Sequence, residues 1–310
     1  MLFGTPADKI TDEFLYWARY EKAKPVSLQT LATYKKVLKI MRVYWADRRL
    51  EAITVDEIKH LRTNMLKRGL TSSYIQTYLC VLRSFFRYCR FERGLNTIEP
   101  KDIQVPAREK KQIDYLTIDE LKRFLAVIKI DTICGLRFKA FVAITLDAGT
   151  RISETVSLDR QFVDLGEPDV VVTGKGNKQR RVFFTAWSMS WAKCYLRQRT
   201  DKSEALFVSH NPEYEGTRSV PEDIRRYFRR YSKLAGLKRV TPHTLRRTAA
   251  THWRFNGASI ETIMHLLGHE DIRVTQRYVG VDWKFNQLEH SRHSMFGKLD
   301  FKAKSLAIRK

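Results

Sequence analysis

The sequence lacks any apolar stretch long enough to cross a bilayer, since a spanning helix needs about 20 consecutive apolar residues. Its first residues also lack the charged region, apolar run and small-residue cleavage site of a secretory signal peptide. The four cysteines, Cys80, Cys89, Cys134 and Cys194, form no C-x-x-C pair or other close cluster. These absences argue against a membrane protein, a disulfide framework and a structural zinc site, and we expect a cytoplasmic protein.

Acidic residues are also scarce relative to basic ones. The 310 residues include 57 Lys and Arg against 34 Asp and Glu, which gives a formal net charge of +23. Such an excess favours a polyanionic partner, because each phosphate that is neutralised releases bound counterions. Nucleic acid is therefore the favoured partner. A merely basic or ribosome-associated protein, or one that binds anionic lipid, is the alternative, and charge alone does not distinguish DNA from RNA.

The first hundred residues predict four helices and little else. Apolar residues at helical spacing, Thr and Ser caps, and breaks at Pro25, Gly69 and Gly94 place these helices at about 8–22, 27–45, 54–69 and 71–92. Basic residues gather on two of them: Lys35, Lys36, Lys39 and Arg42 on the second, and Arg83, Arg87 and Arg90 on the fourth. One such run is usually solvated surface, but its recurrence on two helices favours a surface that faces a DNA duplex.

The hydrophobic periodicity then disappears, and Pro, Lys and Glu dominate. We expect a helical domain over 1–102, a basic linker over 103–113, a second domain over 114–281 and a tail over 282–310. In the second domain the pattern predicts short strands at 162–164, 169–173 and 180–184. It predicts helices at about 118–128, 136–147, 187–199, 221–235, 244–255, 260–267 and 271–279. The expected fold class is mainly α, with a small antiparallel β-sheet in the second domain.

Two segments of the second domain have the composition of a phosphate site. In AGTRISE (148–154), Gly149 ends one helix and Arg151 opens the next, where unpaired backbone N–H groups also favour an anion. Glu154 either holds the Arg151 guanidinium or caps the helix. In the hairpin GKGNKQR (174–180), Lys175 is the main candidate, because a lysine at a glycine-flanked turn can extend away from its sheet. Lys178 and Arg180 are candidate phosphate anchors. A surface ion pair and a solubilising turn are the plainer interpretations.

Two further segments carry the remaining candidates. His243 and Arg246 lie three residues apart at a helix start and therefore share one face. His269 follows a glycine at a helix end, and Tyr278 lies nine residues beyond it. His265 and His269 are four residues apart, which raises a zinc site. That alternative is weak, because Gly268 is expected to end the helix between them and no third ligand is evident in the sequence.

The four segments together closely resemble the tyrosine recombinase (phage-integrase) family, and its Xer-like members in particular. The matching motifs are AGTRISE with Arg151, TGKGNKQRRV with Lys175, HTLRRTAATH with His243 and Arg246, and LGHEDIRVTQRY with His269 and Tyr278. The resemblance covers nearly the whole chain and implies a four-helix, SAM-like core-binding domain followed by the catalytic domain. One departure is Arg247, where relatives often have His.

The resemblance implies a mechanism for breaking and rejoining DNA. Tyr278 would attack the scissile phosphate to give a 3′-phosphotyrosyl link, and the two arginines Arg151 and Arg246 would stabilise the transition state. His243 and His269 would add hydrogen bonds and help to accept the tyrosine proton, and Lys175 would protonate the departing 5′-oxygen. Glu154 would support this set. No metal and no other cofactor is implied.

The resemblance also implies partners. Double-stranded DNA with short inverted-repeat core sites would be the substrate, bound by a homotetramer in which the tail of each protomer docks on its neighbour. A related recombinase or an accessory protein is a further candidate partner, and the protein would associate with the nucleoid. Two alternatives stay open: a type IB topoisomerase-like enzyme that relaxes DNA, and a catalytically silent DNA-binding regulator.

Overall fold

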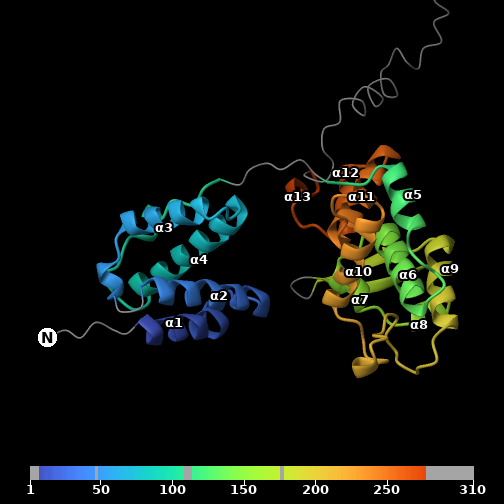
Figure 1. Cartoon of the computed structure of the whole chain (residues 1–310), viewed down its shortest axis with the longest axis horizontal. Helices are drawn as coiled ribbons and strands as arrows, with labels where there is room; N and C mark the ends of the chain where they lie inside the picture. The colour runs from blue at the N-terminus through green and yellow to red at the C-terminus, as the bar shows by residue number, and fades with distance from the viewer. Residues whose placement is uncertain (1–6, 46–47, 108–113, 175–177, 277–310) are drawn as a thin grey trace, which may run out of the picture. The chain divides into compact units, whose positions relative to one another are not determined.

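The computed structural model describes residues 7–45, 48–107, 114–174 and 178–276. The chain forms two compact units (Figure 1), Met1–Lys111 and Gln112–Lys310. Each has its own hydrophobic core. The predicted fold class is confirmed: both units are mainly helical, and the second contains one small antiparallel sheet. None of the helices in the described ranges combines the length and the apolar character needed to cross a membrane.

The N-terminal unit contains the four long helices that the sequence predicts. Its elements in chain order are α1 (Ala7–Tyr16), the π-helical turn η1 (Trp17–Glu21), α2 (Leu28–Tyr44), the 3₁₀ turn η2 (Leu50–Ala52), α3 (Val55–Lys67), α4 (Ser72–Phe91) and the 3₁₀ turn η3 (Pro100–Asp102). α4 supplies the centre of the core, where Phe85 and Phe86 are fully buried. Phe85 meets Phe14 of α1 edge-on, with 5.4 Å between ring centroids.

Side-chain caps determine where these helices begin. Ser27 caps α2, and Thr71 caps α4 through a bond from the backbone N of Tyr74. Thr54 and Glu57 form the predicted capping box at α3: the backbone N of Thr54 donates to Glu57 Oε2 at 2.8 Å, and the backbone N of Glu57 donates to Thr54 Oγ1 at 3.3 Å. Each cap satisfies an N–H group that the helix leaves unpaired, which stabilises the helix by about 1 kcal/mol.

The segment after α4 belongs to the core of the N-terminal unit over part of the range in which we expected a linker. Ile103 is buried, and Val105 packs against the same core. Arg83 Nε donates to the carbonyl oxygen of Ile103 at 3.1 Å. Charged and Pro-rich composition suggested an extended linker, but the two apolar residues in this stretch are enough to hold it on the unit.

The C-terminal unit is built around α6. Its elements are α5 (Ile118–Ala126), α6 (Ile133–Ala148), α7 (Ile152–Val156), α8 (Gln161–Asp164), β1 (Asp169–Thr173), β2 (Gln179–Phe183), α9 (Ala186–Arg197), η4 (Pro212–Tyr214), α10 (Pro221–Leu234), α11 (Pro242–Phe255), α12 (Ile260–Leu267) and α13 (Ile272–Gln276). α6 is buried over most of its length and packs against both α9 and α11 (Figure 1). Its apolar residues are spread around the helix, which is the pattern of a helix inside a core.

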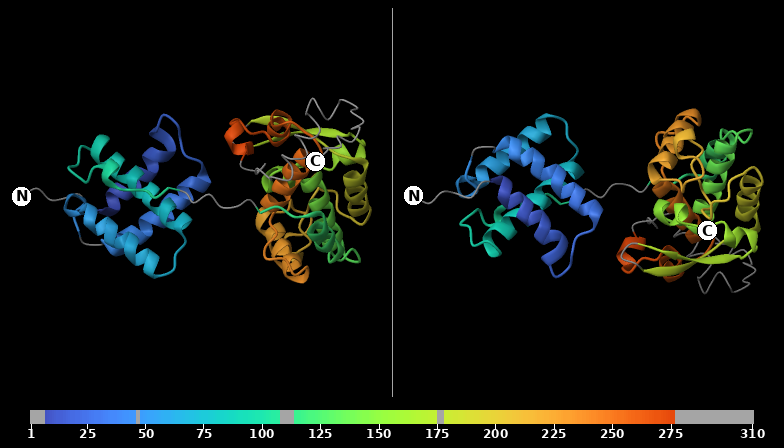
Figure 2. Two further views of the ribbon diagram at one scale, coloured as in Figure 1. Left: turned by 90° about the horizontal axis from the view of Figure 1, so that it is seen from above. Right: turned by 90° about the horizontal axis from the view of Figure 1, so that it is seen from below.

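The sheet is a single hairpin of β1 and β2. The strands are antiparallel, with Val170 opposite Val182 and Val172 opposite Arg180. Figure 2 shows the hairpin passing beside the orange-red helices α12 and α13, and β2 contacts α12. The strand predicted at 162–164 is wrong, because these residues form the one-turn helix α8. Phe162 and Val163 are adjacent and both buried, which a short helix allows and an alternating strand does not.

The end of α6 is fixed by a glycine. Gly149 caps the helix in the left-handed conformation, with φ +58°. A Cβ atom at this position would lie 2.7 Å from Cη2 of Trp253 in α11. Only glycine therefore combines this backbone turn with the close approach of α11, and the turn leads directly to Arg151.

Candidate active site

Most of the residues that the sequence selects for chemistry lie close together in the C-terminal unit. The described members of this group are Arg151, Glu154, Arg180, His243, Arg246 and His269. They come from the start of α7, from β2, from α11 and from the segment after α12. Lys175 and Tyr278 lie outside the described residues, so the roles expected of them stay predictions.

Glu154 lies at the centre of the group and is fully buried in the first turn of α7. Its Oε1 accepts a hydrogen bond from Arg151 Nη1 at 2.6 Å, and its Oε2 accepts one from the backbone N of Arg151 at 2.8 Å. It therefore caps the helix and holds the guanidinium at the same time. Burial alone would raise the pKa of this carboxyl, but the charges of Arg180 and Arg151 outweigh burial and lower the pKa. Glu154 is thus an anion.

Arg180 forms a second ion pair with Glu154, in which Arg180 Nη2 lies 2.8 Å from Oε2. Its Nη1 donates to the carbonyl oxygen of Leu266 near the end of α12. Side chains alternate along a strand, so Arg180 shares the inward face of β2 with the buried Val182. The guanidinium joins the hairpin to α7 and α12, and the DNA contact expected of Arg180 stays a prediction.

Arg246 is the most deeply buried cation of the site, with 1% of its surface exposed. Its Nη1 donates to the carbonyl oxygen of Gly149 at 2.8 Å, and its Nη2 donates to that of Leu267 at 2.6 Å. These carbonyls lie at the C-terminal ends of α6 and α12, where the helix dipole favours a positive charge. Arg246 Nη1 also lies 3.8 Å from Glu154 Oε2. The guanidinium is therefore fixed in position before any substrate binds.

His269 is oriented from both of its ring nitrogens. Its Nε2 lies 3.0 Å from Arg246 Nη2, and its Nδ1 lies 2.9 Å from Oγ1 of the buried Thr275 in α13. A guanidinium can only donate, so Nε2 accepts and the ring proton lies on Nδ1, which donates to Thr275. Burial, followed by the charges of Arg246 and Arg151, lowers the pKa of His269 to about 4. The ring is therefore neutral near pH 7.

His243 is the second residue of α11 and keeps a solvent-accessible side chain. Loss of hydration around the ring, followed by the nearby charges of Arg247, Arg246 and Arg151, lowers its pKa to about 4. Like His269, it is neutral near pH 7 and can accept a proton. The predicted common face of His243 and Arg246 agrees with the electrostatic influence of Arg246 on this ring.

The remaining residues expected to bind DNA divide into two sets. Lys35, Lys36, Lys39 and Arg87 are exposed on α2 and α4, and Lys178 is exposed beside the hairpin, where it pairs with Glu270. Arg42, Arg83 and Arg90 instead contact their own unit. Arg42 Nη2 lies 3.0 Å from Asp12 Oδ1, and Arg90 Nη1 donates to the carbonyl oxygen of Thr97 at 2.6 Å. These three arginines hold the unit together, and DNA binding by either set stays a prediction.

Two residues of the site escaped the sequence interpretation. Thr275 orients His269, and Gly174 lies so close to the site that an added Cβ would be 3.0 Å from Glu154 Oε1. Thr275 had no signal of its own, because a lone threonine in a helix is common. By contrast, the sequence did contain a signal for the inward position of Arg180, because Arg180 lies two residues before the apolar Val182 in a predicted strand.

The geometry is suited to holding an anion through guanidinium groups. Arg151 is one-third exposed beside the buried Glu154, and Arg246 and the two neutral histidines complete the set. In the described part of the chain, no three His, Cys, Asp or Glu side chains are placed to hold a metal ion. Planar cations with fixed donors are well suited to phosphate oxygens.

Comparisons with known proteins identify the family. The Phage integrase family model matches residues 114–284, and the model of the Phage integrase, N-terminal SAM-like domain matches residues 15–93. Tyrosine recombinase XerC of Vibrio vulnificus (strain YJ016) is 32% identical over 89% of this chain and 88% of the relative. Tyrosine recombinase XerC of Vibrio cholerae serotype O1 (strain M66-2) is 30% identical over 87% of this chain and 88% of the relative.

Solved structures share the fold. XerH site-specific recombinase bound to palindromic difH substrate has a TM-score of 0.71 at 17% identity and covers 96% of this chain and 98% of its own. A lambda integrase(75-356) dimer bound to a COC' core site also has a TM-score of 0.71, at 19% identity, and covers 89% and 97%. Fold, site and relatives together define an enzyme of the tyrosine site-specific recombinase class. The chain belongs to the phage integrase family.

Proposed function

We propose that the protein cleaves and rejoins DNA strands at specific sites through a covalent 3′-phosphotyrosyl intermediate on Tyr278. The observation that carries this proposal is the arrangement of Arg151 and Arg246 around the buried carboxylate of Glu154. Two guanidiniums this close would repel each other without an anion between them. Held in this way, they can both donate to the non-bridging oxygens of one phosphate as negative charge develops there.

The reaction balances as a transesterification. The Tyr278 phenolate oxygen forms a bond to phosphorus, the bond from phosphorus to the 5′-oxygen breaks, and Lys175 supplies the proton that the departing oxygen takes up. Rejoining runs the same steps in reverse, with the 5′-hydroxyl as nucleophile. The phosphodiester energy is conserved in the tyrosyl link, so strand joining needs no ATP.

The two histidines then take different roles. His269 has one nitrogen facing Arg246 and the other facing Thr275, so we assign it to orienting the arginine. His243 has a neutral, solvent-accessible ring beside the arginines, and we assign it to accepting the phenol proton of Tyr278. A base with a pKa below neutrality is unprotonated at working pH, although its driving force for proton transfer is small.

Likeness to the tyrosine recombinases supports a proposal for the substrate and the assembly. We propose that four protomers act on two short core sites, as integration, excision or resolution requires, and that the tail 282–310 docks on a neighbouring protomer. This tail lies outside the described residues. The solved relatives were bound to a difH substrate and to a core site, which supports a duplex substrate with short sites.

A recombination assay tests the proposed function. Linear and circular DNA carrying two copies of the site that the protein cleaves should yield recombinant products in excess EDTA, because the arginines take the place of a metal. Relaxation of supercoils without exchange between sites would favour a topoisomerase. DNA binding with neither cleavage nor exchange would favour a silent regulator.

A further inference from the structure

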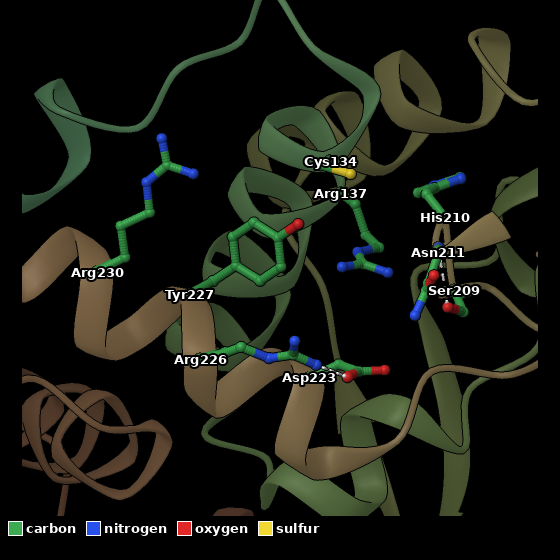
Figure 3. Close-up of a pocket in the computed structure, with 9 residues that line it drawn as sticks. All are labelled: Cys134, Arg137, Ser209, His210, Asn211, Asp223, Arg226, Tyr227 and Arg230. Atoms are coloured by element: carbon green, nitrogen blue, oxygen red, sulfur yellow. Dashed lines mark hydrogen bonds and ion pairs between the residues drawn. The ribbon is translucent and has the colours of Figure 1, made fainter. Parts of the chain in front are cut away.

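A positively charged pocket lies toward the opposite end of α6 from the candidate active site. It has a volume of about 330 Å³ and lies between the start of α6, the segment 209–211 and α10 (Figure 3). Arg137 of α6 lines it, and this residue precedes Ala148 by eleven positions, which is about 16 Å along a helix. The pocket is therefore separate from the group around Glu154.

The Arg137 guanidinium lines this pocket, and one of its N–H groups has no hydrogen-bond acceptor among the described residues. The side chain is only 3% exposed. Its Nη1 donates to the carbonyl oxygen of Val208 at 2.6 Å and to Ser219 Oγ at 3.3 Å. Its Nε is buried and has no hydrogen-bond partner among the described residues. The Nε and Nη2 groups form one edge of the guanidinium, which is an edge that phosphates and carboxylates bind through two parallel hydrogen bonds.

The positive charge of Arg137 also has no carboxylate paired with it in the described part of the chain. Three arginines are buried in the described ranges: Arg199 pairs with Asp201, and Arg246 lies 3.8 Å from Glu154. Arg137 has no carboxylate within ion-pair distance in the same ranges. An arginine does not become neutral by losing its proton, so a buried guanidinium without an anion is unfavourable. The position therefore calls for an anion that the described chain does not supply.

The other groups in the pocket fit such an anion. Arg226 and Arg230 are exposed one turn apart on α10, and the Arg137 guanidinium lies 5.2 Å from the ring centroid of Tyr227 between them. Figure 3 shows the Arg137 guanidinium directed into the space between Tyr227 and Asn211. Asp223 is the carboxylate that lines this pocket, and it is bonded to Arg226 at 2.5 Å.

The polar groups favour phosphate over carboxylate. Ser209 and Asn211 line the pocket on the side opposite α10 and add neutral hydrogen-bonding groups. Donors that converge from several directions suit a tetrahedral anion with acceptor oxygens on all sides. The positive charge of this region also acts on His210. Burial, followed by the charges of Arg137 and Arg199, lowers the pKa of His210 to about 4.

We propose that this pocket is a phosphate-binding site, with Arg137 as the buried anchor and Arg226 and Arg230 at the rim. The phosphate belongs either to a small phosphorylated molecule or to the DNA backbone. Both sources present the same chemistry to the pocket. The site is independent of strand cleavage and does not require the proposed mechanism to be correct.

The first test is a titration of the full-length protein with inorganic phosphate at constant ionic strength, followed by calorimetry. The variant is the double substitution Arg226→Gln/Arg230→Gln, and the matched control is Arg225→Gln/Arg229→Gln, which removes two exposed arginines of the same helix from outside the pocket. Phosphate binding at the candidate active site is common to both variants. We expect the pocket variant alone to lose affinity for one phosphate, by about tenfold or more. Equal phosphate binding by the two variants would overturn the proposal.

The second test observes the anchor directly and does not depend on a variant that folds. In protein with ¹⁵N-labelled arginine, the Nε–H signal of Arg137 should shift when inorganic phosphate is added. If a mixed-sequence DNA duplex abolishes the phosphate-dependent shift by occupying the pocket, the phosphate comes from the DNA backbone. If the duplex leaves that shift intact, it comes from a small molecule. An Arg137 signal that responds to neither phosphate nor DNA would refute the site.

Discussion

Glu154 is the residue on which the candidate active site depends electrostatically. Its two oxygens face Arg151 and Arg180 at hydrogen-bond distance and Arg246 at 3.8 Å. A buried ion pair adds little net stability, because desolvation offsets much of the attraction. Its value here is positional, since one anion fixes cations that would otherwise separate. The sequence indicated Arg151 and Arg246 through their motifs, but only the fold brings Arg180 to the same carboxylate.

Thr275 provides the sharpest test at this scale. Thr275→Val removes the acceptor for His269 Nδ1 while keeping the shape of the side chain, so the proton is no longer held on that nitrogen. We expect DNA cleavage to slow by roughly five- to tenfold, as the loss of one neutral hydrogen bond predicts. Single-turnover cleavage over a range of pH measures the effect.

Thr275→Ser serves as the control because it keeps the hydroxyl group. If Ser restores both the rate and the pH profile, the hydroxyl positions His269. A Val variant with the wild-type rate and pH profile would show that Thr275 has only a packing role.

The lowered histidine pKa values predict how stability depends on pH. His210, His243 and His269 have folded-state pKa values of about 4, below the ordinary value of 6.5. Between these values the unfolded chain binds more protons than the folded one, so stability is complete above pH 6.5 and falls as the pH drops toward 4. Thermal unfolding across this range should show a falling melting temperature. Substitution of His269 by Asn should flatten the dependence, and an unchanged slope would contradict the assignment for this residue.

At the scale of elements, helix ends place the site residues. Gly149 ends α6 and Gly268 ends α12, both in the left-handed conformation. The carbonyl oxygens of Gly149 and Leu267 both accept bonds from Arg246. The position of the Arg246 guanidinium therefore depends on two helix ends at once. A shift of either end would move the guanidinium.

Gly149→Ala tests this dependence, and Gly166→Ala is its matched control. Both glycines have positive φ, but an added Cβ meets Trp253 at 2.7 Å at position 149 and has open space at position 166. We expect the control to lower the free energy of unfolding by about 1 kcal/mol, from backbone strain alone. The Gly149 variant should lose at least about 1 kcal/mol more, because of the overlap with Trp253. Denaturant unfolding compares the two, and equal losses would contradict the steric account.

Local chemistry made most elements predictable. Capping boxes at Thr54 and Thr117 fixed two helix starts, and the glycines and the asparagine of the turn predicted the hairpin. The strand expected at 162–164 failed because two adjacent apolar residues are compatible with either a strand or a helical turn. The choice depends on what lies around them in the fold, which the local sequence does not contain.

At the scale of the whole molecule, the basic residues behind the net charge of +23 fall into exposed ones and ones that contact their own unit. Lys35, Lys36, Lys39 and Arg87 are exposed, whereas Arg83 and Arg90 hold the segment after α4. The sequence predicted a basic surface on both helices but could not separate these sets. Their separation depends on tertiary contacts with residues further along the chain, such as Ile103 and Thr97.

Paired substitutions separate DNA binding from stability. Arg87→Gln should lower the slope of log affinity against log salt for duplex binding by about 0.9, as expected for the loss of one phosphate contact. Arg83→Gln should instead lower the stability of the N-terminal unit by about 1.5–3 kcal/mol, because its charged hydrogen bond to Ile103 is lost. Salt titration and thermal unfolding of both variants measure this. An unchanged salt slope for Arg87→Gln would remove that residue from the interface.

The central claim is that Tyr278 forms the covalent link to DNA, and trapping on a nicked suicide substrate tests it most directly. The nick lets the short cleaved fragment diffuse away, so the protein remains attached and survives denaturation in detergent. We predict that the wild-type protein becomes linked to the 3′-phosphate through Tyr278. Tyr278→Phe should bind the same DNA with unchanged affinity and give no adduct. A covalent adduct in the Phe variant, or a link to the 5′ end, would contradict the account.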